Sequence, residues 1–182
     1  MSVKRQTEQG VTDALRPNLH RIAFASSTGR LPQGFWKDHY VLGYLASTAN
    51  LLARAATKNT LTAGDYGVIF CDVLDALAKE FSSEPYGDVT SRIGDLTDSP
   101  SAAWISGAQN ANKVMAVTFG FDDYDDDEDV KAARKQADKT PSPSSLGISG
   151  VTSPHAVVSS ILMDKLFYDV VEQRLEPPSP DC

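Results

Sequence analysis

Residues 62–81 read TAGDYGVIFCDVLDALAKEF and show the clearest helical pattern in the chain. The apolar side chains recur every three or four residues, which places them along one stripe of an α-helix. Thr62 and Asp65 have the spacing of a capping box, which satisfies free backbone N–H groups at a helix start. Pro85 and Gly87 end the pattern. The stretch therefore predicts an amphipathic helix with defined ends.

A second helical pattern covers residues 35–57, just before this stretch. Its apolar row is formed by Val41, Leu45, Thr48 and Leu52, and is widened by Tyr40 and Tyr44. Gly43 and Ser47 fall on the opposite, polar side. Only residues 58–61 separate the two patterns, and so short a connection favours antiparallel packing of the two helices.

Three further helices are expected downstream. Ser99 and Pro100 supply an N-cap and a first-turn proline for a third long helix. Residues 114–121 also fit a strand, being rich in β-branched and aromatic side chains, but no good partner strand exists and a helix is preferred. A polar helix over residues 125–139 and a last helix over residues 155–175 complete the set.

These patterns predict an all-α fold, a bundle of about five helices. Residues 1–33 contain Pro17 and show no sustained period, so they are interpreted as an irregular basic arm that has room for one short helix over residues 7–15, ending before Pro17. Residues 34–175 then form a single helical domain, with a Pro/Ser-rich loop at 140–150. Residues 176–182 are expected to form an extended, flexible tail.

The charge of the chain is unevenly distributed. Its 182 residues carry 17 Lys and Arg against 24 Asp and Glu, a net charge of -7. The run at residues 122–129 accounts for this whole excess, whereas residues 1–30 are net positive. The run is either a solvated helix start, which the basic residues after it favour, or a contact surface for a basic partner that includes Asp125, Asp126 and Asp127.

The acidic run resembles a calcium loop only at its beginning. Asp123, Asp125 and Asp127 alternate like the first three ligands of an EF-hand. Glu128 then stands where the turn needs glycine, and Arg134 where a bidentate glutamate is needed. The three histidines lie in different elements, and no Cys-x-x-Cys or His-Glu-x-x-His motif occurs. The sequence therefore predicts no metal site and no cofactor.

No catalytic residue is assigned from the sequence. Asp38 and His39 are adjacent on a helix and point about 100° apart, so they cannot act as a base with its orienting partner. Asp72 and Asp75 share a helical face, but it is the polar one. Cys71 lies at the edge of an apolar stripe, which is typical of a packed, unreactive thiol.

The last helix carries more apolar side chains than one narrow stripe. Its two neighbouring rows are Val158, Leu162, Leu166 and Val170, and Met163, Phe167 and Val171. Such width is typical of a central helix or one shared with another chain. We therefore expect six of these residues, all except Val171, to bind a protein partner or a second copy of the chain, as part of a non-catalytic small subunit, adaptor or inhibitor.

Two alternatives remain open at this stage. One is an enzyme or small-molecule binder with a site between the first two long helices, drawing on His39, Tyr40, Tyr44, Asp72 and Asp75. The other is an accessory subunit that binds nucleic acid through the basic arm. The two distant cysteines, the lack of a signal-like opening and the lack of a long apolar run predict a cytoplasmic protein without a membrane span.

Overall fold

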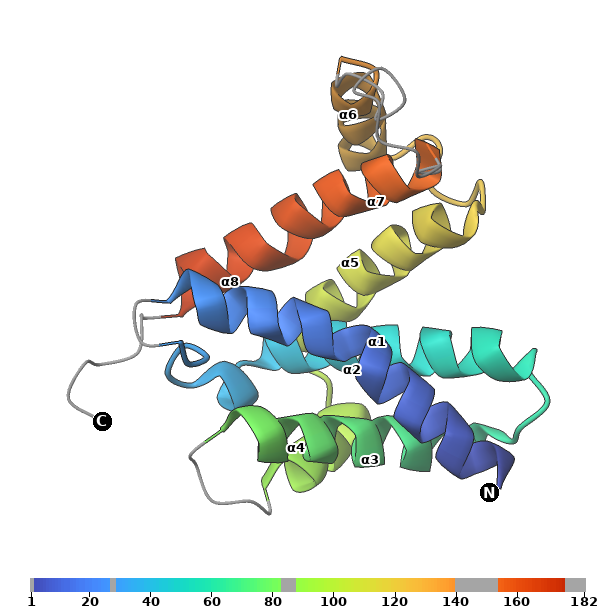
Figure 1. Cartoon of the computed structure of the whole chain (residues 1–182), viewed down its shortest axis with the longest axis vertical. Helices are drawn as coiled ribbons and strands as arrows, with labels where there is room; N and C mark the ends of the chain where they lie inside the picture. Colours follow the sequence, from blue (N-terminus) through green and yellow to red (C-terminus); the bar gives the residue numbers. More distant parts are fainter. Residues whose placement is uncertain (1, 27–28, 83–87, 140–153, 176–182) are drawn as a thin grey trace.

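The computed structural model describes residues 2–26, 29–82, 88–139 and 154–175, and every regular element in these ranges is helical (Figure 1). The helices are α1 (Val3–Ala25), α2 (His39–Thr57), α3 (Ala63–Phe81), α4 (Asp88–Asp98), α5 (Ala102–Phe119), α6 (Glu128–Ala137), α7 (Pro154–Met163) and α8 (Asp169–Arg174). A 3₁₀ turn, η1 (Phe35–Lys37), precedes α2, and a π-helical turn, η3 (Asp164–Tyr168), joins α7 to α8. The all-α class is confirmed. With α7, η3 and α8 counted as one, the described part of the chain holds seven helices rather than about five.

The prediction of an irregular arm over residues 1–33 is wrong for most of that range. Val3–Ala25 form one helix, with Pro17 inside it. Its buried stripe includes Thr7 and Thr12, whose hydroxyls donate to the carbonyls of residues one turn earlier, at 2.9 and 2.8 Å. These bonds satisfy the hydroxyls without exposing them. Two polar residues thus take part in a buried face that an apolar pattern does not reveal.

The start of α3 is as the local sequence predicts, whereas the start of α5 differs from the prediction. The Thr62–Asp65 capping box is present in full, with Asp65 N–H donating to the Thr62 hydroxyl and Thr62 N–H to the Asp65 carboxylate. The cap of α5 is Ser101 rather than Ser99, since Ser101 Oγ accepts from Trp104 N–H at 3.2 Å. Residues 114–119 are helical, as preferred, and Gly120 ends α5 in the left-handed conformation.

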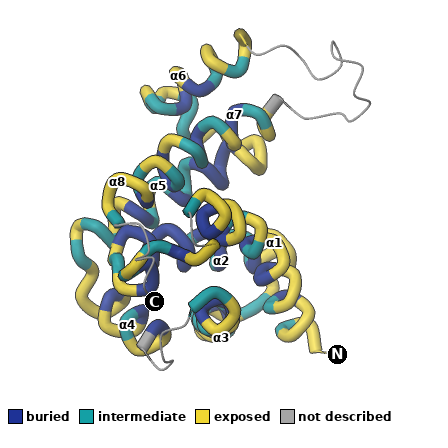
Figure 2. Tube along the Cα trace, turned by 60° about the vertical axis from the view of Figure 1, so that its left-hand side comes forward, coloured by how far each residue is buried: buried dark blue, intermediate teal, exposed yellow. Residues whose placement is uncertain are grey.

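Helix α2 is the centre of the molecule. Residues 40–46 are all buried, and α2 packs against α1, α3 and α5 (Figure 2). The side of α2 that the sequence marks as polar lies against α5, where Ser47 Oγ donates to Asn112 Oδ1 at 2.8 Å. Small and hydrogen-bonded side chains on this side therefore serve packing.

The α2 and α5 backbones touch at two glycines. A Cβ atom on Gly43 would lie 2.3 Å from the carbonyl oxygen of Trp104, and one on Gly107 would lie 2.1 Å from that of Tyr40. Real Cβ atoms do not approach an oxygen so closely, and neither backbone can move without shifting a central helix. The crossing thus admits glycine alone at both positions.

We expect Gly43→Ala and Gly107→Ala each to lower the free energy of unfolding by about 3 kcal/mol or more, because the added methyl overlaps backbone. Gly10→Ala is the matched control. Gly10 lies inside α1 with no heavy atom within 4 Å of an added Cβ, so that change is expected to stabilise by about 0.5–1 kcal/mol. Urea unfolding followed by circular dichroism measures all three, and equal effects would contradict the close crossing.

Candidate functional site

The residues predicted to bind a partner on the last helix are mostly buried within this chain. Val158, Leu162, Leu166 and Phe167 are buried, and Met163 and Val170 are half-buried. The prediction that the last helix exposes surplus apolar surface is therefore wrong for four of the six residues predicted to bind a partner. Its cover comes from α1, α2, α5 and α6, whose positions around the helix no local pattern specifies.

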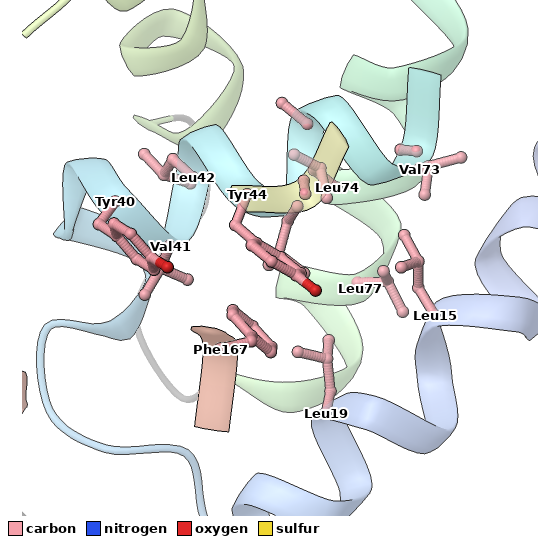
Figure 3. Packing of buried hydrophobic residues seen from close by; sticks show 14 of the residues in the cluster. Leu15, Leu19, Tyr40, Val41, Leu42, Tyr44, Val73, Leu74, Leu77 and Phe167 are labelled. Atoms are coloured by element: carbon pink, nitrogen blue, oxygen red, sulfur yellow. The ribbon is translucent and has the colours of Figure 1, made fainter. Parts of the chain in front are cut away.

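Phe167 shows how this cover is built. Its ring stacks on Tyr44 of α2, with ring centroids 4.2 Å apart and planes 11° apart. Figure 3 shows the pair in the core, with Leu19 of α1 beside Phe167. Stacking of this kind adds to the burial of both rings. A side chain read as a partner contact thus anchors the chain's own core.

The π-helical turn also ties the last helix to α2 and α5. A π turn leaves backbone carbonyls outside the regular α-helical ladder. The Leu166 carbonyl accepts a hydrogen bond from the Tyr40 hydroxyl, which in turn accepts from Asn110 Nδ2 at 2.8 Å. Burial, as the largest cause, raises the pKa of Tyr40 and keeps this hydroxyl protonated as a donor.

The same turn binds α1 through its polar side chains. Asp164 forms an ion pair with Arg21 at 2.6 Å, and the Arg21 guanidinium lies 3.9 Å from the centre of the Tyr168 ring. The Tyr168 hydroxyl donates to Asn18 Oδ1 at 3.0 Å. The turn is therefore a structural junction, in which Asp164 and Tyr168 both contact α1.

Tyr40→Phe is expected to lower the free energy of unfolding by about 1–3 kcal/mol, because it leaves the Leu166 carbonyl and the Asn110 amide without their buried partner. Tyr168→Phe is the control, since its hydroxyl binds Asn18 at a half-buried site, where water can replace the lost partner. That loss is expected to be under about 1 kcal/mol. Chemical denaturation compares the two, and an equal or smaller effect at Tyr40 would contradict the assigned bonds.

The side chains named for a small-molecule site do not come together. Tyr40 and Tyr44 are buried against the last helix, whereas His39 is exposed at the start of α2. Asp75 forms an ion pair with Lys79 on the surface of α3, at 2.7 Å. Asp72 is exposed on the side of α3 that faces α1. Helices α2 and α3 pack against each other, and both contribute buried side chains to one hydrophobic core, among them Leu45, Ala49, Ile69, Leu74 and Leu77.

One contact between a histidine and a hydroxyl is not predictable from local sequence patterns, because its two residues lie far apart in the chain. His39 Nδ1 lies 3.0 Å from Ser101 Oγ, the N-cap of α5. A catalytic pair needs a third group that orients the histidine. The adjacent carboxylate of Asp38 instead caps α2 at Val41 N–H and pairs with Arg174 at 2.8 Å. The contact therefore joins two helix starts.

Cys71 fits its interpretation as a packed residue. It is half-buried against the core, and burial, with a smaller contribution from the charge of Asp72, raises the pKa of its thiol. A raised pKa lowers the thiolate fraction and hence the reactivity. Cys182 lies outside the described residues, as do the 140–150 loop and the tail.

Glu8 of α1 faces Asp72 of α3, and two carboxylates that meet are unfavourable when both are charged. Burial raises the pKa of Glu8 most, and the negative charge of Asp72 and a hydrogen bond to it raise it further. Lys4 and Arg5 act in the opposite direction. The ionised form of Glu8 therefore opposes the packing of α1 on α3.

A folded-state pKa above the usual 4.5 of Glu8 means that its contribution to stability is fully present below that pH and is lost as the pH rises through the raised value. Glu8→Gln should therefore be more stable than the parent at pH 7, with the difference shrinking toward pH 4.5. Glu80→Gln should destabilise, because it removes the ion pair with Arg16 at 2.8 Å. Urea titrations across this pH range decide the sign, and a less stable Glu8→Gln at pH 7 would refute the assignment.

The carboxylates predicted to bind a partner have cations within the chain. Asp125 pairs with Arg134, and Asp126 pairs with Lys131 at 2.9 Å. Asp127 caps α6 and pairs with Lys113 at 2.8 Å. Much of the acidic run is thus neutralised locally, in line with its interpretation as a helix start.

The residues just before these three present a different surface, which we call the tip: Phe119–Asp123. Phe119 and Phe121 are 40% and 57% exposed, and their ring centroids lie 6.0 Å apart. Asp122 and Asp123 are exposed, and neither forms an ion pair with any described residue. At the tip, exposed aromatic rings therefore lie beside carboxylates that form no ion pair with any described residue.

Among the residues that the structure describes, no group of His, Cys, Asp or Glu is arranged to hold a metal ion. Within the same residues, no helix combines the length and apolarity needed to span a bilayer. Comparison with known proteins finds no matching family model, no matching curated protein and no matching solved structure. The function is therefore inferred from the chain's own residues.

Proposed function

We propose that this protein is a non-catalytic interaction module, a small subunit, adaptor or inhibitor, that contacts a basic protein partner through the tip. One observation carries the proposal: Phe119 and Phe121 stand exposed beside Asp122 and Asp123, which have no cation within the described residues. Aromatic side chains are frequent anchors of interfaces, because they bury large area with few rotatable bonds.

The arrangement of the tip supports a basic partner. Exposed aromatic rings favour a protein surface that removes them from water. The adjacent carboxylates would attract and orient cationic side chains on that surface, which raises the association rate and the specificity. Figure 1 shows the end of α5 and α6 at one extremity of the molecule, away from α1–α4. A partner therefore has access to the tip without disturbing the core.

The expected contacts on the last helix contribute less to this proposal. Only Met163 and Val170 of the six keep partial exposure. The basic residues of α1 also offer limited support for nucleic-acid binding, because Arg16 pairs with Asp13 and Glu80, and Arg21 with Asp164. At the tip, exposed aromatic rings lie next to carboxylates that form no ion pair with any described residue.

Site-specific photo-crosslinking in the native cell tests this function. A benzophenone amino acid at position 121 is expected to give a discrete protein adduct. The same probe at Phe24, an aromatic position 79% exposed on α1, serves as the matched control and should give none of that size. Asp122→Asn with Asp123→Asn should reduce the adduct at position 121 about three- to thirtyfold, because the steering charge is lost.

The outcome that contradicts the proposal is equally specific. Equal adduct patterns at positions 121 and 24, or a pattern at 121 that the two Asn substitutions leave unchanged, would show that the tip makes no selective contact. Circular dichroism of the substituted proteins must match that of the parent, which separates a lost contact from a lost fold.

A further inference from the structure

Helix α6 has few buried side chains. Of its ten residues only Val130 and Ala133 are buried. Figure 2 shows α6 at one extremity of the molecule, with exposed residues along its outer side. A helix this short is marginal by itself in water, so contacts with other helices must hold it in place.

Besides the packing of α6 against α7, ion pairs fix the first turn of α6. Lys113 of α5, whose side chain is 12% exposed, lies 2.8 Å from Asp127 and 2.9 Å from Asp129. Lys165 of η3 reaches the other oxygen of Asp129 at 2.8 Å. Two lysines from two different helices therefore hold the first turn of α6.

The titration behaviour of these groups agrees with this geometry. Burial lowers the pKa of Lys113, but hydrogen bonds to Asp127 and Asp129 outweigh it and hold that pKa above its usual range. Hydrogen bonds from Lys165 and Lys113 hold the pKa of Asp129 below its usual range. Both pKa shifts favour the charged forms of Lys113 and Asp129 that the ion pairs require.

We propose that α6, with its cap Asp127, is a strap fastened by the Lys113–Asp127–Asp129–Lys165 cluster, and that it opens locally when ionic strength rises, while α1–α5 stay folded. Pairs near the surface weaken as salt screens their attraction, whereas burial of an apolar core does not depend on them. Because Asp127 follows the tip by a few residues, opening would also free the C-terminal anchor of the tip.

This inference does not depend on the proposed function, because it concerns the isolated chain. Hydrogen–deuterium exchange of the full-length protein tests it, with the amides of α6 compared with those of α3 in the same sample. Raising sodium chloride from about 50 mM to about 1 M shortens the screening length several-fold. We expect exchange in α6 to accelerate about tenfold relative to α3, as loss of three partly exposed pairs implies.

Two lysine substitutions supply the matched comparison. Lys113→Met keeps the length of the side chain and removes its charge, so it should accelerate α6 exchange by a similar factor at low salt and abolish most of the salt response. Lys131→Met is the control, because Lys131 lies in α6 and, among the described residues, its ion pair is with the nearby Asp126. It should leave the exchange ratio within about twofold of the parent.

Either of two results would overturn the strap. In the first, α6 and α3 exchange at rates that change together with salt, so that opening is global. In the second, Lys113→Met either accelerates both helices equally or leaves the full salt response in place. A change confined to α6, present in the parent at high salt and in Lys113→Met at low salt, supports it.

Discussion

The backbone contact between α2 and α5 is the constraint on which the remaining packing depends. Where Gly107 meets the Tyr40 carbonyl, no side chain separates the two helices, so α2 lies deep enough for residues 40–46 to be buried on every side. The same approach brings Asn110, one turn beyond Gly107, to the Tyr40 hydroxyl. That hydroxyl then binds the π turn of the last helix. A close crossing of two helices thereby positions a third.

Local sequence predicts an element well when its pattern and its ends agree. The helix at Thr62 has both a capping box and an unbroken apolar stripe, and both are present. Prediction from local sequence fails where buried positions are occupied by residues that are not large and apolar. Thr7 and Thr12 lie in the buried face of α1, where their hydroxyls bond to the backbone of their own helix. Because these two positions are polar, the sequence of α1 shows no sustained apolar period. Gly43 reads as part of a polar side for a similar reason, although its lack of a side chain is what packing requires.

The candidate site depends on ion pairs and ring contacts between residues that lie far apart in the sequence. A count of charges finds the acidic run, but it cannot show that Lys113 and Lys165 neutralise Asp127 and Asp129 from other helices. Likewise, the width of the apolar face on the last helix is visible, but the Tyr44 ring that covers Phe167 is not. Exposed Phe121 has no distinguishing signal at all, because exposure of an aromatic residue is a property of its surroundings.

The acidic run combines two roles that compete for the same kind of interaction. Its later carboxylates hold α6 through lysines of the chain, and its earlier ones, Asp122 and Asp123, stay available to cations from outside. A cationic surface docked on the tip would also lie near Asp127 and repel Lys113. Binding that repelled Lys113 would weaken the ion pairs that hold α6 in place. Weaker ion pairs would in turn leave Asp127 and Asp129 available to the same surface. By linkage, a partner that prefers the open strap would itself shift the chain toward that state.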